Sequence, residues 1–504
     1  MDAYHKLLQE FHDIVLLDSV QSMIHWDLET YIPPKGVKQR SEQMSLLSRL
    51  EHRMTTSEKV GKLLEETEKE MEDLTKEQKR NLHLIRRKYE EETSLPEDLV
   101  GSLSKQKAIS VDTWKKAKVK NDWSIFEPEL EKTIELSIER AEILMDAKDM
   151  PSVYDTMIDD FEKGMTKEKI ASVFSELRRG LVPLTQKCAE VSSDVKTDFL
   201  NRVVPIETQK KIATDLATTI GYDTTSDEAV GRIDPTEHPF TTGYYDDVRI
   251  TLNYKENNLV GMMYAALHEG GHALYEQNMN PDWKYQPIGQ AASFGIHESQ
   301  SRFIENMVGR SPEFLEYYYP RLNELTDDLF SDIDKSRFAK AVNLVEPSKI
   351  RIEADEVTYS LHVIIRFEIE KALFGGEIEI SDLPQVWNDK YDEYLGVEVE
   401  NDSEGVMQDT HWASGYYGYF PSYALGNVYD GMWLQKINKD MPKWQKNLTR
   451  GKVTPVTEWL IENVHHYGSL YDPADLIEEV VGKRPKAQPF LSYLEDKYSS
   501  IFGF

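Results

Sequence analysis

The residues with the clearest chemical potential lie in the segment 264–275, where His268, Glu269 and His272 form an H-E-x-x-H pattern. On a helix with 3.6 residues per turn, the two histidines project from one face and can bind a single tetrahedral Zn²⁺. Glu269 lies about 100° further around the helix, where its carboxylate can take a proton from a metal-bound water. The spacing therefore predicts a zinc site that performs hydrolysis.

The residues around this pattern favour a helix with one buried side. Gly270 and Gly271 each cost a helix roughly 1 kcal/mol relative to alanine, so we expect another element to approach this backbone closely. The alternative explanation for two adjacent glycines is ordinary tight packing between two helices, without a functional role. The apolar positions that define the buried side are Leu259, Val260, Met263, Leu267 and Leu274.

A catalytic zinc site needs a third protein ligand and one open position. The longer motif that ends in a third histidine is excluded, because Tyr275 and Asn278 occupy the places of its glycine and histidine. Glu276 lies four residues after His272, and this further turn carries its carboxylate along the axis and away from the metal. The third ligand must therefore come from another part of the chain.

The best candidate is Glu298, in a second helix-like stretch that begins at Ser293. If this stretch and the first helix form an antiparallel pair, the carboxylate of Glu298 can reach the metal. The alternative is an i,i+4 ion pair with Arg302, which contributes only about 0.2–0.5 kcal/mol at a surface. The residues alone leave both possibilities open.

The pattern His268-Glu-Gly-Gly-His272, followed by His297-Glu298-Ser-Gln, resembles the thermostable Taq-type metallocarboxypeptidases. These are zinc or cobalt enzymes that remove residues from the C-termini of peptides. The resemblance runs nearly from end to end, and four more motifs agree in order. They are His238-Pro-Phe240, Asp247-Val-Arg249-Ile-Thr251, Ile350-Arg351-Ile-Glu-Ala-Asp355 and Gly405-Val-Met-Gln408-Asp409-Thr-His411-Trp412.

The resemblance implies that His268, His272 and Glu298 bind one Zn²⁺ per chain, with Co²⁺ as the alternative ion. It also implies a homodimer. From the motifs we expect His238 and Gln408 to contact the substrate, although a histidine in a loop before Pro239 would by itself more often be structural.

The stretch 411–423 concentrates aromatic side chains that carry hydrogen-bonding groups. For any single tyrosine, core packing is the commoner role. The functional alternative is stabilisation of the oxyanion that forms when hydroxide attacks a carbonyl. The resemblance points to His411 with either Tyr419 or Tyr423, and the sequence does not decide between the two tyrosines.

Arg351 has a planar guanidinium that suits a carboxylate, the group that marks the C-terminus of a peptide. We expect it to open a helix that Ser348 caps and to form an i,i+4 pair with Asp355. Arg249 is a second candidate for the same carboxylate.

Residues 247–253 alternate apolar and polar side chains, which predicts a strand with one buried face. Such a strand beside the metal helix can form a cleft edge that pairs with an extended peptide. A purely structural, half-buried strand is the alternative.

The composition limits the binding partners and the cellular compartment that we expect for this protein. The 504 residues include 59 Lys and Arg against 89 Asp and Glu, a net charge of −30 that opposes binding to nucleic acid or anionic membranes. No apolar run is long enough for a membrane span, and the N-terminus lacks a secretory signal pattern. The single Cys188 cannot form an internal disulfide. We therefore expect a cytoplasmic protein.

Helical periodicity dominates the chain, and only residues 244–254 clearly indicate a strand. We predict a mainly α fold, a large helical metallopeptidase with a deep active-site cleft and a small β-sheet at its edge. Residues 1–504 should form a single catalytic domain, with two lobes around the cleft as the alternative. Long helices are expected at residues 36–53, 75–92, 125–149, 166–190, 355–373 and 486–500.

Together these features predict a metal-dependent carboxypeptidase that releases single amino acids from peptides, with Glu269 as the general base. An oligoendopeptidase would use the same metal centre. A catalytically silent helical peptide-binding protein is a further alternative, but it would not need to keep Glu269.

Overall fold

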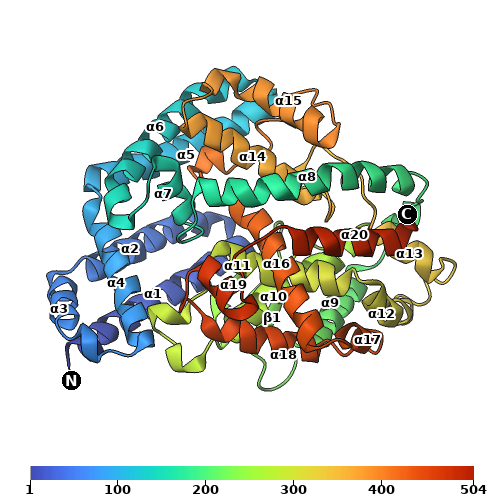
Figure 1. Cartoon of the computed structure of the whole chain (residues 1–504), viewed down its shortest axis with the longest axis horizontal. Helices are drawn as coiled ribbons and strands as arrows, with labels where there is room; N and C mark the ends of the chain where they lie inside the picture. The colour runs from blue at the N-terminus through green and yellow to red at the C-terminus, as the bar shows by residue number, and fades with distance from the viewer. Residues whose placement is uncertain (1) are drawn as a thin grey trace.

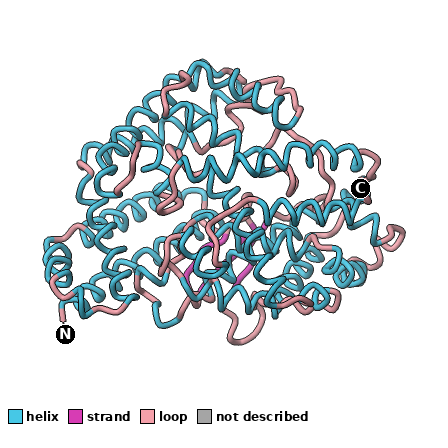
Figure 2. The backbone as a smooth tube through the Cα atoms, viewed as in Figure 1, coloured by secondary structure: helices cyan, strands magenta, loops and turns pink. Residues whose placement is uncertain are grey.

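The computed structural model describes residues 2–504 and shows a mainly helical protein with one small sheet near its centre (Figures 1 and 2). The first four helices lie together at the N-terminal end of the molecule (Figure 1). Apolar residues of α1, α3 and α4 form a small core of their own, which includes Leu7, Phe11, Leu64 and Ile85. These helices are α1 (Ala3–Thr30), α2 (Val37–Thr55), α3 (Glu58–Glu68) and α4 (Lys76–Ser94).

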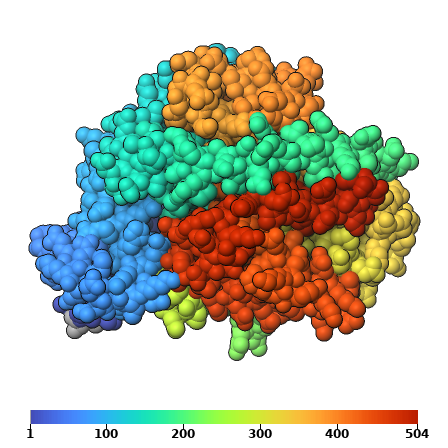
Figure 3. Space-filling view, viewed as in Figure 1, coloured from blue at the N-terminus to red at the C-terminus, as the bar shows by residue number. Residues whose placement is uncertain are grey.

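The next helices build the middle of the molecule. Helix α8 crosses it as a long band, in contact with α14 and α15 on one side and with α20 on the other (Figures 1 and 3). The helices of this part are α5 (Glu97–Lys120), α6 (Trp123–Lys148), α7 (Val153–Asp159), α8 (Lys167–Ser192) and α9 (Ile206–Ile220).

In the C-terminal half of the chain, α10 packs against α11 and α11 packs against α16. Most buried apolar residues between Ala117 and Tyr498 belong to one continuous core. A seven-residue π-helical segment, Phe303–Gly309, directly follows α11. The helices are α10 (Leu259–Gln277), α11 (Phe294–Arg302), α12 (Pro312–Leu325), α13 (Lys335–Val342), α14 (Tyr359–Phe374), α15 (Leu383–Leu395), α16 (Phe420–Asp440), α17 (Trp444–Leu448), α18 (Thr454–Asn463), α19 (Pro473–Val481) and α20 (Gln488–Phe502).

The sheet has three strands, β1 (Gly231–Pro235), β2 (Thr241–Tyr244) and β3 (Asp247–Leu252), in the order β1-β3-β2. The strand predicted from alternation is β3, but it lies at the centre of the sheet, parallel to β1 and antiparallel to β2. Its backbone is therefore already paired on both sides, and the expectation that it pairs with a peptide is wrong. The edge strand beside α10 is β2.

The six long helices predicted from periodicity all occur, and the mainly helical fold with a small sheet is confirmed. Helix α14 begins at Tyr359, four residues later than predicted. The reason is Asp355, whose carboxylate accepts hydrogen bonds from the backbone N–H groups of Val357 and Thr358 (2.9 and 3.0 Å) and so forms a turn before the helix. No helix in residues 2–504 combines the length and apolar character needed to cross a membrane.

The close approach expected at the paired glycines occurs between α10 and α11. A Cβ atom on Gly271 would lie 2.5 Å from the carbonyl oxygen of Gln300 and 2.7 Å from the Cα of Ser301. Because both are backbone atoms of α11, no side-chain rotation can make room. The spacing of the two helices thus depends on this glycine.

Gly271→Ala is therefore expected to destabilise the protein by about 1–3 kcal/mol, the usual cost of overpacking. It should also weaken metal binding, because it displaces α11. The matched control is Gly101→Ala in α5, where the added methyl has no neighbour within 4 Å and should stabilise the helix by up to about 1 kcal/mol. Urea denaturation and zinc titration measure both effects. Equal behaviour of the two variants would contradict the tight α10–α11 contact.

Candidate metal centre

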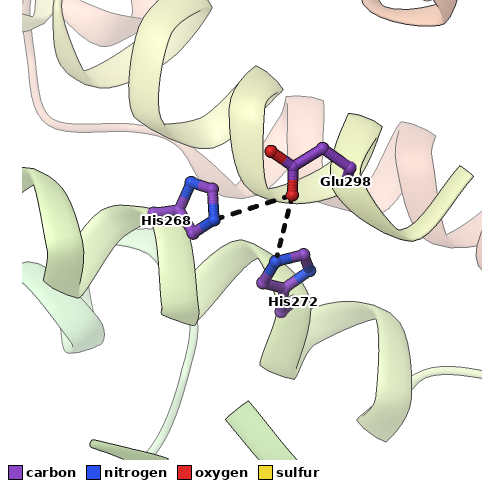
Figure 4. Close-up of side chains that lie close together, drawn as sticks. All are labelled: His268, His272 and Glu298. Carbon is purple, nitrogen blue, oxygen red and sulfur yellow. Dashed lines mark ion pairs between the residues drawn. The ribbon is translucent and has the colours of Figure 1, made fainter. Parts of the chain in front are cut away.

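Helices α10 and α11 bring His268, His272 and Glu298 together (Figure 4). The Glu298 Oε2 atom lies 3.8 Å from His268 Nε2 and 3.5 Å from His272 Nε2. Ligand atoms about 2.0–2.1 Å from a tetrahedral ion are roughly 3.4 Å apart, so this spacing fits a single ion. The histidine side chains are 20% and 15% exposed, which leaves the site open to a small molecule.

Both histidines are oriented by carboxylates, one directly and one through another histidine. His268 Nδ1 donates to Glu305 Oε2 (2.9 Å). His272 Nδ1 lies 2.5 Å from Nδ1 of His297, whose Nε2 donates to Glu276 Oε1 (2.8 Å). These bonds occupy the Nδ1 atoms of both histidines and direct both Nε2 atoms towards the metal position.

The residues that orient the two histidines through their Nδ1 atoms were not predicted from the sequence. Glu305 lies on the π-helical segment after α11, and His297 precedes Glu298. Glu276, which the sequence analysis excluded as a ligand, holds His297 and is therefore part of the site. Motif spacing carries no signal for Glu305, because its contact with His268 depends on how α10 and the π-helical segment pack.

The position of Glu298 is compatible with both possibilities that the sequence left open. One oxygen faces the two histidines, and the other accepts a hydrogen bond from Arg302 Nε (2.8 Å). Burial alone would raise the pKa of Glu298, but Arg302 and the histidines hold it well below its usual range. The carboxylate is thus ionised, as a metal ligand must be.

The two histidines differ electrostatically. Burial lowers the pKa of His268, but the charges of Glu298 and Glu305 outweigh this and raise it to about 9. Burial and the neighbouring His297 lower the pKa of His272 to about 3. A metal must therefore displace a proton from His268, whereas His272 already offers its lone pair.

Glu269 is buried beside this set and faces β2. Its Oε2 accepts a hydrogen bond from Thr241 Oγ1 (2.7 Å). Burial raises the pKa of Glu269. A carboxylate with a raised pKa and a fixed orientation suits a group that must accept and later return a proton.

His411, Tyr419 and Tyr423 lie together where α16 begins, and α16 packs against α11. Tyr423 Oη lies 3.5 Å from His411 Nε2, and the rings of His411 and Tyr419 are 5.3 Å apart. Burial lowers the pKa of His411 to about 4, so its imidazole is neutral. Burial raises the pKa of Tyr419 to about 12, and the charge of Glu298 adds to this shift.

The predicted helix start at Arg351 and its predicted ion pair with Asp355 are both wrong. Arg351 lies in a short 3₁₀ helix without a side-chain cap, and its guanidinium pairs with Asp409 (2.8 Å) rather than Asp355. Arg366 binds the second oxygen of Asp409 (2.6 Å). The local i,i+4 pair fails because the Asp355 carboxylate is occupied by backbone N–H groups.

Arg351 is nevertheless linked to the metal centre through Tyr359, which sequence reasoning missed. Arg351 Nη1 donates to Tyr359 Oη (3.2 Å). The guanidinium of Arg302 stacks 3.9 Å above the centre of the same ring, and Arg302 in turn binds Glu298. Arg302 therefore contacts the ring of Tyr359, and Arg351 contacts its hydroxyl group.

Gln408 has no free hydrogen-bonding group for a substrate. Its Oε1 accepts from the backbone N–H of Arg351 (2.9 Å) and from Arg366 (2.8 Å). Its Nε2 donates to the carbonyl oxygens of Lys349 (2.9 Å) and Glu404 (2.8 Å). Gln408 thus holds Arg351 in place.

Arg249 and His238 lie on or beside the sheet. Both oxygens of Asp247 accept hydrogen bonds from the guanidinium of Arg249 (2.7 Å each), which also lies 4.3 Å above the ring of Trp26. Arg249 therefore forms a complete ion pair with a carboxylate of its own strand. His238 is exposed between β1 and β2 and makes no hydrogen bond with the described residues.

Comparison with known proteins decides the family. A family model described as "Carboxypeptidase Taq (M32) metallopeptidase" matches residues 6–498. The chain belongs to the M32 carboxypeptidase family. It is 39% identical to thermostable carboxypeptidase 1 of Thermus thermophilus and 37% identical to carboxypeptidase 1 of Bacillus subtilis, each over 99% of both chains. The family resemblance inferred from the motifs is confirmed.

Solved structures agree with this assignment. The M32 carboxypeptidase from Deinococcus radiodurans matches with a TM-score of 0.95 at 34% identity, over 100% of both chains. The carboxypeptidase of Pyrococcus furiosus matches with a TM-score of 0.94 at 31% identity, over 99% of both. The protein is a metal-dependent carboxypeptidase of this family.

Glu298→Ala is expected to weaken zinc binding by roughly 10³-fold or more, because the ligands of a zinc site share a binding free energy on the order of 10–16 kcal/mol. The matched control is Glu276→Gln, which keeps every ligand and should cost only about 10- to 100-fold through the altered support of His297. Competition with a chromogenic chelator measures both. If Glu276→Gln is the more damaging change, the wrong carboxylate has been assigned.

Proposed function

We propose that this chain releases single amino acids from the C-termini of peptides at a Zn²⁺ ion held by His268, His272 and Glu298, with Glu269 as the general base. The observation that carries this proposal is the convergence of two Nε2 atoms and one carboxylate oxygen on a single point. An N₂O donor set suits zinc, with cobalt as the second choice.

The bound ion would acidify a water molecule and polarise the carbonyl of the scissile bond. Glu269 takes the proton of the attacking water and passes it to the leaving amine. Thr241 keeps one oxygen of Glu269 in position during both transfers. His411, with Tyr419 or Tyr423, donates a hydrogen bond to the oxygen on which negative charge develops.

Arg351 binds the terminal carboxylate of the peptide. Arg351 and Arg366 share the single carboxylate of Asp409, and His411 is neutral, so this group keeps one net positive charge. A second carboxylate can balance that charge. Arg249 is not part of this proposal, since Asp247 already neutralises it. His238 stays a predicted substrate contact, and Gln408 is reassigned to positioning Arg351.

Two alternatives are weaker. An endopeptidase would have no use for the net positive charge beside the metal ligands. A silent binding protein would not need Glu269, which is present, buried and oriented. We further propose that residues 1–504 act as one catalytic unit. The homodimer and the cytoplasmic location expected from the sequence remain predictions, and light scattering of the zinc-loaded protein tests the first.

Glu269→Gln is expected to retain zinc but to lose at least about 10³-fold in kcat, because an amide cannot accept the proton of the water. The ligands and the bulk of the side chain are unchanged. Metal analysis and turnover of the purified variant test this expectation. Turnover close to that of the wild type would exclude Glu269 as the base.

Amidation of the peptide C-terminus is expected to lower kcat/KM about 10- to 150-fold, since a hydrogen bond to a charged group contributes about 1.5–3 kcal/mol. Acetylation of the N-terminus should have little effect. Arg351→Lys should reduce the difference between acid and amide, whereas the control Arg249→Lys should preserve it. Mass spectrometry of timed digests measures the products. Internal fragments, or equal cleavage of acid and amide, would favour the endopeptidase alternative.

A further inference from the structure

Two large aromatic side chains that pack against Phe161 are exposed. Phe294 is 51% exposed and Tyr416 is 42% exposed. Phe294 is the first residue of α11 and lies four residues before Glu298, so both side chains project from the same face of the helix, one turn apart. An exposed phenylalanine next to a metal ligand has no role in the mechanism described above.

Phe294 and Tyr416 belong to an aromatic cluster with Phe161 and Tyr419. The ring of Tyr419 lies 4.9 Å from that of Phe161, 5.4 Å from that of Phe294 and 6.1 Å from that of Tyr416. The contacts of Tyr419 with Phe161 and Phe294 are edge-to-face, an arrangement that aromatic pairs favour. The cluster therefore presents a preformed apolar surface whose inner residue, Tyr419, also contacts His411.

The backbone around the cluster is also fixed. The buried carboxylate of Glu162 accepts hydrogen bonds from the backbone N–H of Gly295 and from Ser293 Oγ, both at 3.0 Å. The backbone N–H of Phe294 donates to the carbonyl oxygen of Phe161 (3.2 Å). These bonds hold the start of α11, and with it the backbone of Phe294, against residues 161–162.

A series of contacts links Arg351 to the aromatic cluster, and this series indicates which residue of a bound peptide the cluster would meet. Arg351 lies 5.1 Å from the ring of Tyr423, and Tyr423 lies 5.2 Å from the ring of Tyr419. Phe294 in turn lies 5.4 Å from the ring of Tyr419. If the terminal carboxylate lies at Arg351 and the scissile carbonyl at the tyrosines, the next side chain towards the N-terminus of the peptide meets the cluster.

We propose that Phe161, Phe294, Tyr416 and Tyr419 form the subsite for the penultimate residue of the peptide, and that this subsite takes aromatic or large aliphatic side chains. Exposed aromatic surface favours burial against another apolar group. Lys107 lies at the rim, with its ammonium 4.5 Å from the centre of the Tyr416 ring. Its charge disfavours a lysine or arginine at the penultimate position. This inference rests on the proposed function.

The test uses the zinc-loaded enzyme and N-acylated dipeptides Xaa-Ala, with Xaa as Phe, Leu, Gly, Asp or Lys and alanine release as the readout. The wild type should prefer Phe over Gly by about 10- to 100-fold in kcat/KM, the discrimination that one apolar pocket provides. Phe294→Ala should reduce this ratio to about threefold or less, and Lys107→Ala should raise the relative rate for Lys. Val119→Ala, at a position 89% exposed in α5, is the control and should keep the ratio.

Equal rates for all five peptides with the wild type would overturn the subsite. So would a Phe294→Ala variant that slows every peptide by the same factor, because that result would indicate a general structural role. If Phe294→Ala does not fold, Tyr416→Ala at the exposed rim takes its place, with the same reduction of the ratio expected. Failure to release alanine from any peptide would instead overturn the proposed function.

Discussion

The structure depends on the contact between α10 and α11, and in particular on the different contacts that the two carboxylate oxygens of Glu298 make. One oxygen faces the two histidines of α10, while the other is fixed by Arg302 on its own helix. This arrangement needs the helices to lie unusually close, which the glycine at position 271 permits. A larger residue there would move the carboxylate relative to the histidines, and the three ligand atoms would no longer converge.

The supports of this contact extend over much of the molecule. Arg302 stacks on Tyr359 at the start of α14, and Tyr359 accepts a hydrogen bond from Arg351. Arg351 in turn pairs with Asp409, two residues before His411. A displacement of α14 would therefore affect both Glu298, the proposed metal ligand, and the proposed carboxylate site. The metal centre and the proposed carboxylate site therefore depend on the same contacts between segments that are distant in the sequence.

The local part of this site could be predicted from the sequence, and the non-local part could not. The spacing of His268 and His272 on one helix face follows from helical geometry, and the strand β3 follows from alternation. The central place of β3 could not be predicted, since β1 and β2 are short and lack an alternating pattern. The partner of Arg351 was predicted wrongly, because Asp409 is remote in sequence while Asp355 is near.

The most direct test of the central claim is anomalous diffraction from crystals of the zinc-loaded protein, recorded on both sides of the zinc absorption edge. One strong anomalous peak per chain is expected, about 2.0–2.2 Å from the Nε2 atoms of His268 and His272 and from an oxygen of Glu298. A peak beside Glu276 and His297, or a metal that Glu298 does not touch, would contradict this claim.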